Sequence, residues 1–222
     1  MKRTQTIPDI FGITPIVQTP RPVERSLFDD ASGKVTYQDG FLTRAEADDL
    51  FRFLSSCTLK REKVVVRGKT WLTSRFVRAF GDPGLTFEYS GTRTSTGEAG
   101  WGSPLLEALV ARIREHYGVR PNFVHVNLYP TGEAKMGYHS DFEEMHVPGL
   151  PIFSVSVGAE RRFLLRPKAE PKKPRHEVRL KHGSLLTMQR NTQKNWQHSV
   201  PAALGVKTAR YNLTFRCFKV QK

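Results

Sequence analysis

Cysteine is scarce in this chain of 222 residues, which contains only Cys57 and Cys217. Two thiols this far apart provide neither a disulfide framework nor the paired spacing of a cysteine-based zinc site. Each is better interpreted as a small buried apolar residue in a reducing compartment. The scarcity excludes the class of small, disulfide-rich secreted proteins.

Long hydrophobic runs are also missing. No segment approaches the roughly 20 apolar residues that a membrane-spanning helix needs, and the N-terminus lacks the apolar run of a signal peptide. We therefore expect a cytoplasmic or nuclear protein with no membrane association. Hydrophobic residues still make up 38% of the chain, with 14 Phe and 3 Trp, which suffices for the packed core of one full domain.

Acidic residues are also few: the chain contains 21 Asp and Glu against 35 Lys and Arg, which gives a formal net charge of +14. Such a basic excess favours a polyanionic partner, most often nucleic acid. The alternative is a solvated surface tuned for solubility, a purpose that acidic residues serve better than basic ones. We therefore expect the chain to bind nucleic acid.

The chain divides into an N-terminal arm and one folded domain. Residues 1–30 contain four prolines before residue 23 and little periodicity, which predicts an extended or poorly ordered arm ahead of a single domain at 31–222. Over about 120–220, short β-rich runs separated by Gly and Pro predict a jelly-roll core, so the domain is α+β but mainly β. The predicted runs are Phe123–Tyr129, Ile152–Val157, Arg162–Leu165, Glu177–Leu180, Ser184–Met188 and Arg210–Phe218.

Two helices are expected before this core. Thr43 and Glu46 have the spacing of a capping box, in which each side chain bonds the other residue's backbone N–H. The second helix is predicted to begin with Ser103 as cap and Pro104 in the first turn, and to end at Gly118. We expect both helices to pack over one outer face of a sheet.

A candidate metal site is formed by His139-Ser140-Asp141, followed 57 residues later by His198. Residues two apart on an extended segment point to the same side, so His139 and Asp141 can act together. An HxD pair alone is more often structural than a ligand pair; the combination with His198 is what counts. Two histidines and one carboxylate can occupy one face of an Fe(II) ion, and without thiolates Fe(II) suits these donors better than zinc or copper.

The segment Arg210–Arg216 has a doubly cationic face. Alternation puts Arg210, Asn212, Thr214 and Arg216 on one side and Tyr211, Leu213 and Phe215 on the other. Two arginines on a central strand are costly unless an anion neutralises them, and a guanidinium binds a carboxylate through two parallel bonds. The alternative is an outer strand with both arginines in water. Asn127 and Tyr129, a second pair of hydrogen-bonding residues two apart, argue against it.

Together these motifs resemble those of the AlkB-type Fe(II)/2-oxoglutarate-dependent dioxygenases, in particular the nucleic-acid repair branch. The resemblance extends from about Gly84 to Phe218 and rests on 127–129, 139–141, 198 and 210–216. It implies a double-stranded β-helix in which His139, Asp141 and His198 hold Fe(II). These three are then the catalytic and metal-binding residues.

The resemblance also implies a site for 2-oxoglutarate. Arg210 would pair with the distal carboxylate, and Arg216 would lie near the carboxylate that reaches the iron. The full set implied for the co-substrate is Asn127, Tyr129, Arg210, Asn212, Thr214 and Arg216. With O₂, an N-methyl group on a base would be hydroxylated and released as formaldehyde, and 2-oxoglutarate would become succinate and CO₂.

The nucleotide-recognition region is expected at about 60–95. In the repair branch a flipped base stacks between an aromatic ring and the first metal-binding histidine, which here would be Tyr89 and His139. Tyr89 can alternatively be a core or edge-strand aromatic. Glu143 matches an acidic residue that contacts the exocyclic amine of the base, and it would favour cationic lesions such as 1-methyladenine and 3-methylcytosine.

One departure concerns the hairpin with which duplex-specific relatives wedge into DNA. Its tip here is Arg67, which can stack or hold phosphate but is a poorer hydrophobic wedge than an aromatic residue. Duplex preference is left open, with tolerance of single strands expected. Trp71, Arg75 and Arg78 could line a nucleic-acid groove, although Trp71 could equally belong to the core.

Three alternatives remain open at this point. The same iron and 2-oxoglutarate chemistry could act on a protein or a small molecule instead of DNA or RNA. The chain could be a basic nucleic-acid-binding module with a vestigial site. A zinc hydrolase is a third possibility, but it lacks an obvious base and has no use for two buried arginines. For the leading hypothesis we expect a monomer.

Overall fold

The computed structural model describes residues 23–66, 68–89, 92–98, 100–141, 145–172 and 174–219. Most of the predicted arm lies outside these residues, but its end differs from the prediction. Arg25–Asp30 form strand β1, which pairs antiparallel with β2 (Gly33–Gln38). The ring of Phe28 in β1 stacks on Trp196, with 4.4 Å between centroids. The folded domain therefore begins before the boundary predicted at residue 31.

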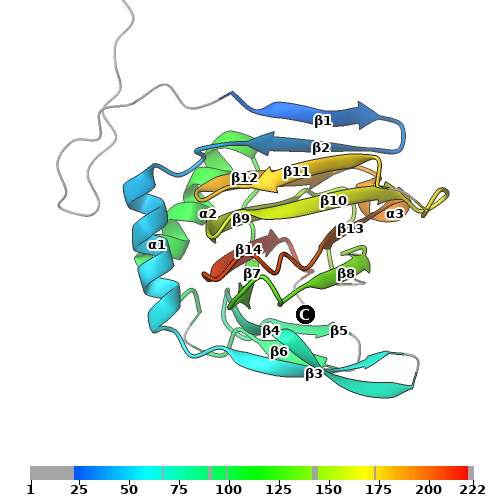
Figure 1. The fold of residues 1–222 in the computed structure, drawn as a ribbon. Helices are drawn as coiled ribbons and strands as arrows, with labels where there is room; N and C mark the ends of the chain where they lie inside the picture. Colours follow the sequence, from blue (N-terminus) through cyan, green and yellow to red (C-terminus); the bar gives the residue numbers. More distant parts are fainter. Residues whose placement is uncertain are drawn as a thin grey trace, which may run out of the picture.

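Two antiparallel sheets form the body of the molecule (Figure 1). The larger has the order β1-β2-β12-β9-β14-β7-β4-β3, and the smaller has the order β11-β10-β13-β8. A separate pair is formed by β5 (Thr86–Tyr89) and β6 (Thr92–Ser95). The remaining strands are β3 (Lys60–Val66), β4 (Lys69–Gly81), β7 (Phe123–Tyr129), β8 (Met136–His139), β9 (Ile152–Gly158), β10 (Arg161–Pro167), β11 (His176–Leu180), β12 (Ser184–Gln189), β13 (Trp196–Val200) and β14 (Arg210–Arg216). This arrangement confirms the predicted jelly roll.

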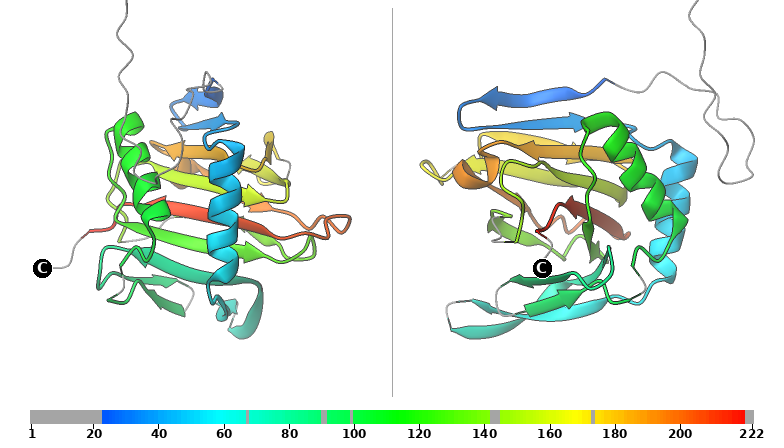
Figure 2. Two further views of the ribbon diagram at one scale, coloured as in Figure 1. Left: turned by 90° about the vertical axis from the view of Figure 1, so that its left-hand side faces the viewer. Right: turned by 180° about the vertical axis from the view of Figure 1, so that it is seen from behind.

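Two long helices cover one face of the larger sheet. In the left view of Figure 2, α1 (Arg44–Ser56) and α2 (Pro104–Tyr117) cross in front of its strands. Leu50 and Leu54 of α1 and Ile113 of α2 join the core formed with the sheet, which confirms the predicted packing. A third helix, α3 (Thr192–Asn195), is a single turn before β13. No helix among the described residues combines the length and apolarity needed to cross a membrane.

The helix ends follow the sequence signals. Thr43 accepts a hydrogen bond from the backbone N–H of Glu46, and the Glu46 carboxylate accepts one from the backbone N–H of Thr43. Ser103 caps α2 through the N–H of Leu105, and Gly118 ends it with a φ of 68°. That left-handed conformation costs glycine little, which explains why α2 stops there.

The central strand β14 separates an apolar face from a polar one. Its apolar side chains, Tyr211, Leu213 and Phe215, pack beneath the helices. On the opposite face Arg210 and Arg216 are buried between the two sheets, at 0% and 4% exposure. The division of faces follows the predicted alternation, and the alternative that left both arginines in water is wrong.

Candidate metal and co-substrate site

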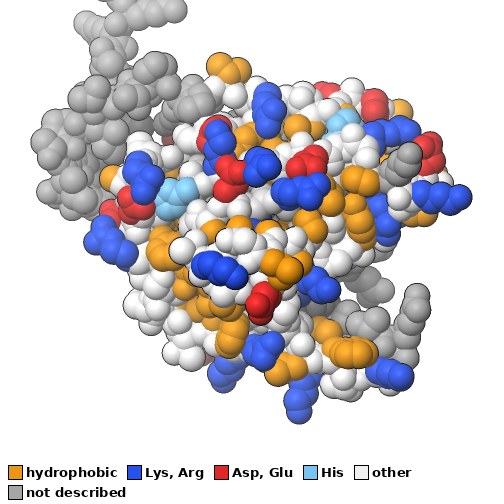
Figure 3. Space-filling model, viewed as in Figure 1, with side chains coloured by type: hydrophobic (Ala, Val, Ile, Leu, Met, Phe, Trp, Pro, Cys, Tyr) orange, Lys and Arg blue, Asp and Glu red, His pale blue; other side chains and the backbone are white. Residues whose placement is uncertain are grey.

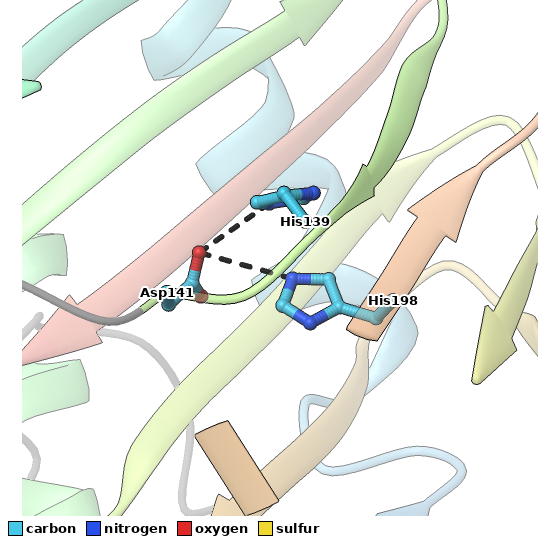
Figure 4. Close-up of side chains that lie close together, drawn as sticks. All are labelled: His139, Asp141 and His198. Atoms are coloured by element: carbon cyan, nitrogen blue, oxygen red, sulfur yellow. Dashed lines mark ion pairs between the residues drawn. The ribbon is translucent and has the colours of Figure 1, made fainter. Parts of the chain in front are cut away.

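Three potential metal ligands converge from two neighbouring strands and a loop. His139 is the last residue of β8 and lies directly opposite His198 of β13, while Asp141 follows β8 by two residues. The Asp141 Oδ1 atom lies 3.4 Å from His139 Nε2 and 3.8 Å from His198 Nε2. All three side chains turn toward one point (Figure 4), and their ligand atoms lie within 4.8 Å of one another. This spacing suits a single ion.

Neighbouring groups orient each of these side chains. The Nδ1–H of His139 is placed to donate to the carbonyl of Gly137 at 2.9 Å, which leaves Nε2 free to bind a metal. The His198 ring stacks on Phe163 with 5.1 Å between centroids. The backbone N–H of Asp141 donates to Gln193 Oε1 of α3 at 2.7 Å. The ligands are therefore oriented by the fold itself.

The charges of the site favour a divalent cation. Burial raises the pKa of the Asp141 carboxyl, but Arg216, 3.2 Å away, and the two histidines outweigh it, so the pKa lies well below its usual value. Burial, with His139 nearby, lowers the pKa of His198 to about 3. At neutral pH the buried groups are a carboxylate and a neutral imidazole, which are the protonation states that bind metal. With only nitrogen and oxygen donors, the set fits Fe(II).

A second polar site lies beside the first, around Arg210. The guanidinium is fully buried; its Nη2 donates to Ser156 Oγ at 2.9 Å, while Nε and Nη1 have no hydrogen-bond partner among the described residues. Its central carbon lies 5.2 Å from the ring centroid of Tyr129. Burial lowers the pKa of Arg210 to about 10, so the group stays charged at neutral pH. Buried unpaired donors on a cation are costly, and a carboxylate ligand would satisfy them.

Comparison with known proteins agrees with this geometry. The 2OG-Fe(II) oxygenase superfamily matches residues 34–216. The DNA oxidative demethylase ALKBH2 of Mus musculus is 42% identical over 183 residues, covering 78% of this chain and 75% of the mouse protein. The chain belongs to the AlkB-type 2OG-Fe(II) oxygenases. Enzymes of this superfamily use Fe(II), 2-oxoglutarate and O₂, so the alternatives of a zinc hydrolase and of a vestigial binding module are not supported.

Two further relatives extend the comparison. The human Alpha-ketoglutarate-dependent dioxygenase alkB homolog 3 is 32% identical over 212 residues, covering 89% of this chain and 72% of that protein. The solved structure of OsALKBH1 has a TM-score of 0.60 at 18% identity, with 87% of this chain and all of that chain covered. At that identity the second likeness shows the shared fold alone.

In this AlkB-type oxygenase the remaining co-substrate candidates are held in a hydrogen-bonded layer. Asn127 accepts a hydrogen bond from Arg75 Nε at 2.7 Å, and Asn212 donates to Ser154 Oγ at 2.8 Å. Thr214 is buried on the same face of β14. Arg75 was expected to line a nucleic-acid groove, but it is buried beside Asn127 instead. Arg75 shares one side of β4 with Val77 and Ala79, which are also buried, and this spacing was the signal that could have indicated an inward side chain.

Of the three base-binding candidates, only the backbone of Tyr89 lies among the described residues. Tyr89 is the last residue of β5, and the position of its side chain lies outside the described part of the structure, as do Arg67 and Glu143. The hairpin of β3 and β4 that would carry Arg67 is present. Trp71 on this hairpin is 59% exposed, so its interpretation as a core residue is wrong.

Proposed function

We propose that this protein is an oxidative demethylase that repairs N-alkylated bases of the 1-methyladenine and 3-methylcytosine type in DNA. The observation that carries the proposal is the pairing of the His139–Asp141–His198 cluster with the partner-deficient Arg210 in one buried site. Relatives named as DNA oxidative demethylases, at 42% and 40% identity in mouse and human, support DNA as the substrate.

Each part of the site has a distinct task in this reaction. His139, Asp141 and His198 would hold Fe(II), which supplies oxidation of an N-methyl C–H bond with O₂ and 2-oxoglutarate. Arg210 would bind the distal carboxylate of 2-oxoglutarate, with Tyr129 and Asn127 beside it. Arg216, which neutralises Asp141, would lie near the other end of the co-substrate. Asn212 and Thr214 would support this layer.

The overall reaction balances. A methylated base, 2-oxoglutarate and O₂ yield the unmodified base, formaldehyde, succinate and CO₂. One oxygen atom goes to succinate and the other to the hydroxymethyl group on nitrogen, which releases formaldehyde when the C–N bond breaks and the base keeps the proton. Asp141 and His198 are buried, whereas the His139 side chain is 30% exposed, so the substrate would approach from the side of His139.

Substrate recognition would involve residues outside the metal and co-substrate sites. Tyr89 would stack on the flipped base, Glu143 would contact its exocyclic amine, and Arg67 would meet the strand at the hairpin tip. Lys and Arg side chains are scattered over the face drawn in Figure 3, which supports contact with a phosphate backbone. We extend the proposal to RNA, to a monomeric enzyme, and to action in the cytoplasm or nucleus.

Mass spectrometry of short oligonucleotides containing 1-methyladenine or 3-methylcytosine tests the proposal. With protein, Fe(II), ascorbate and 2-oxoglutarate, the oligonucleotide should lose one methylene mass, and omission of 2-oxoglutarate should prevent the loss. Succinate release without demethylation would move the search to a protein or small-molecule substrate. Neither product from folded, iron-loaded protein would overturn the proposal.

A further inference from the structure

A second buried cation lies beside the proposed co-substrate pocket. Arg161, the first residue of β10, is 2% exposed, and its guanidinium carbon lies 5.6 Å from the ring centroid of Tyr129. Arg210 contacts the same ring at 5.2 Å. Tyr129 is thus shared by two buried arginines, and the described residues provide no carboxylate that pairs with either of them.

Arg161 bonds backbone carbonyls instead of an acid. Its Nη2 donates to Pro201 O at 2.7 Å and to Ala134 O at 2.8 Å, and its Nη1 donates to Thr131 O at 3.2 Å. A longer contact of 3.5 Å reaches Gly132 O. Carbonyl dipoles compensate the charge in part, but they leave a net positive charge in a buried place.

These carbonyls belong to two connections between strands that contain the candidate site residues. Residues 130–135 join Tyr129 at the end of β7 to β8, whose last residue is His139. Pro201 begins the second connection, residues 201–209, which joins β13 with His198 to β14. Gly132 fastens the two connections to each other, because its N–H donates to Val206 O and its carbonyl accepts from Ala203 N. Arg161 therefore bonds both the connection between β7 and β8 and the connection that follows β13.

The two connections pack closely where Arg161 bonds their carbonyls. A Cβ atom on Gly132 would lie 1.7 Å from Ala203 O, so the connections touch directly and leave no room to shift. The planar fork of an arginine can bond several carbonyls at once, whereas an ammonium is a single point charge. Lysine at 161 would keep the charge without the full set of bonds.

We propose that Arg161 is a positioning residue for 2-oxoglutarate, which holds Tyr129 and Arg210 in place and adds a second positive charge at the end of the pocket that receives the distal carboxylate. This inference rests on the co-substrate site of the proposed function. It explains the buried charge of Arg161, because the distal carboxylate of 2-oxoglutarate would supply the anion that the described residues do not provide.

The test compares Arg161→Met with Arg162→Met. Arg162 is the next residue, on the outer face, where it pairs with Glu177 in an exposed ion pair. In the iron-loaded full chain, Arg161→Met should raise the KM for 2-oxoglutarate about tenfold or more, as expected when a charged hydrogen-bonding group is lost. The kcat should fall no more than about threefold. Arg162→Met should leave both constants near wild type.

A second readout separates positioning from structural support. 2-Oxovalerate has the same chain length as 2-oxoglutarate but no distal carboxylate, so its inhibition constant should not change in Arg161→Met. The rise in melting temperature that 2-oxoglutarate gives the Mn(II)-loaded protein should become smaller. Arg161→Lys should fall between wild type and Arg161→Met, and it carries the test alone if the methionine variant does not fold.

A fall in kcat with an unchanged KM would overturn the proposal, because it would indicate a smaller fraction of active protein. An equal weakening of 2-oxoglutarate and 2-oxovalerate would also overturn it, because the effect would not involve the distal carboxylate. Failure of the wild-type protein to bind 2-oxoglutarate would instead overturn the co-substrate site itself. The KM, the kcat and the inhibition constant are measured as succinate release and the melting temperature needs no turnover, so these readouts do not depend on demethylation of DNA.

Discussion

At the scale of single residues, Asp141 connects the two halves of the site. Its carboxylate contacts both histidines and forms an ion pair with Arg216 of β14. One negative charge thus serves a metal on one side and a cation on the other. The ligand set carries little net charge, and three protein ligands leave other positions of an octahedral ion open.

Replacement of His139 separates chemistry from binding. His139→Ala removes one of three ligands, so turnover should fall by more than the roughly 10–100-fold that loss of an outer hydrogen-bond partner causes at metal sites. Affinity for a methylated oligonucleotide should stay within about threefold, because phosphate contacts dominate it. Demethylation assays and fluorescence anisotropy measure the two quantities, with His116→Ala, at an exposed position of α2, as control. Equal loss of both would indicate damage to the fold.

At the scale of elements, local patterns predicted the two long helices and six strands of the jelly-roll core. All six β-rich runs are strands, and both helix starts are correct, because alternation, caps and glycines act within a few residues. The last run was drawn too long, since β14 ends at Arg216. Strand β1 was missed because it is mostly polar and exposed, although it pairs with the neighbouring β2 across a two-residue turn. Its Phe28 packs on the distant Trp196.

Side chains whose direction depends on long-range register could not be assigned from sequence. Arg161 and Arg162 are neighbours of the same type, and only the pairing of β10 with β11 and β13 decides that the first is buried and the second exposed. By contrast, the cluster of His139, Asp141 and His198 was predictable, because few other residues could bind a metal together.

The capping box of α1 gives a prediction at this scale. Thr43→Ala removes the acceptor for Glu46 N and should lower the free energy of unfolding by about 1 kcal/mol. Glu46 also bonds Arg112 of α2, so both helices share the anchor. Urea unfolding measures the loss, with Thr58→Ala, an exposed threonine just after α1, as control. Equal effects of the two substitutions would contradict a capping role.

At the scale of the whole molecule, stability depends on pH, because buried histidines bind protons less readily in the folded chain than in the unfolded chain. Burial lowers the pKa of His125 well below its usual value and also lowers that of His146. Below about pH 6.5 the unfolded chain binds protons on these histidines that the folded chain does not, so the free energy of unfolding falls as the pH falls. The loss continues until the pH reaches the lowered pKa values.

Melting temperatures of the metal-free protein between pH 7.5 and 5 test this dependence. The melting temperature should fall on acidification, and His146→Gln should make the slope below pH 6.5 shallower. Glutamine can still donate to the carbonyl of Leu150, the present partner of His146 at 3.0 Å, but it does not titrate. An unchanged slope in the variant would show that His146 does not contribute.

The charge of the whole molecule has a separate consequence. The chain has a net charge of +14. On the face drawn in Figure 3, Lys and Arg side chains are interspersed with apolar ones. Such a distribution attracts a polyanion without fixing how it is oriented, and it leaves orientation to the cations near the site. The hairpin of β3 and β4, where Lys69 and Trp71 are exposed, lies at the end of the larger sheet (Figure 1).

Salt titration distinguishes contacts made by this hairpin from general attraction. If about 5 phosphates are contacted, the logarithm of the binding constant should fall against the logarithm of salt concentration with a slope of about −4.5 for duplex DNA and about −3.5 for single strands. Lys69→Ala should reduce the slope by about 1, whereas Arg44→Ala on α1 should leave it unchanged, because α1 covers the opposite face of the sheet from the site. Equal reductions would mean that DNA contacts the surface without a fixed orientation. A site that must receive one flipped base would then have to select it after binding, from among many orientations of the strand.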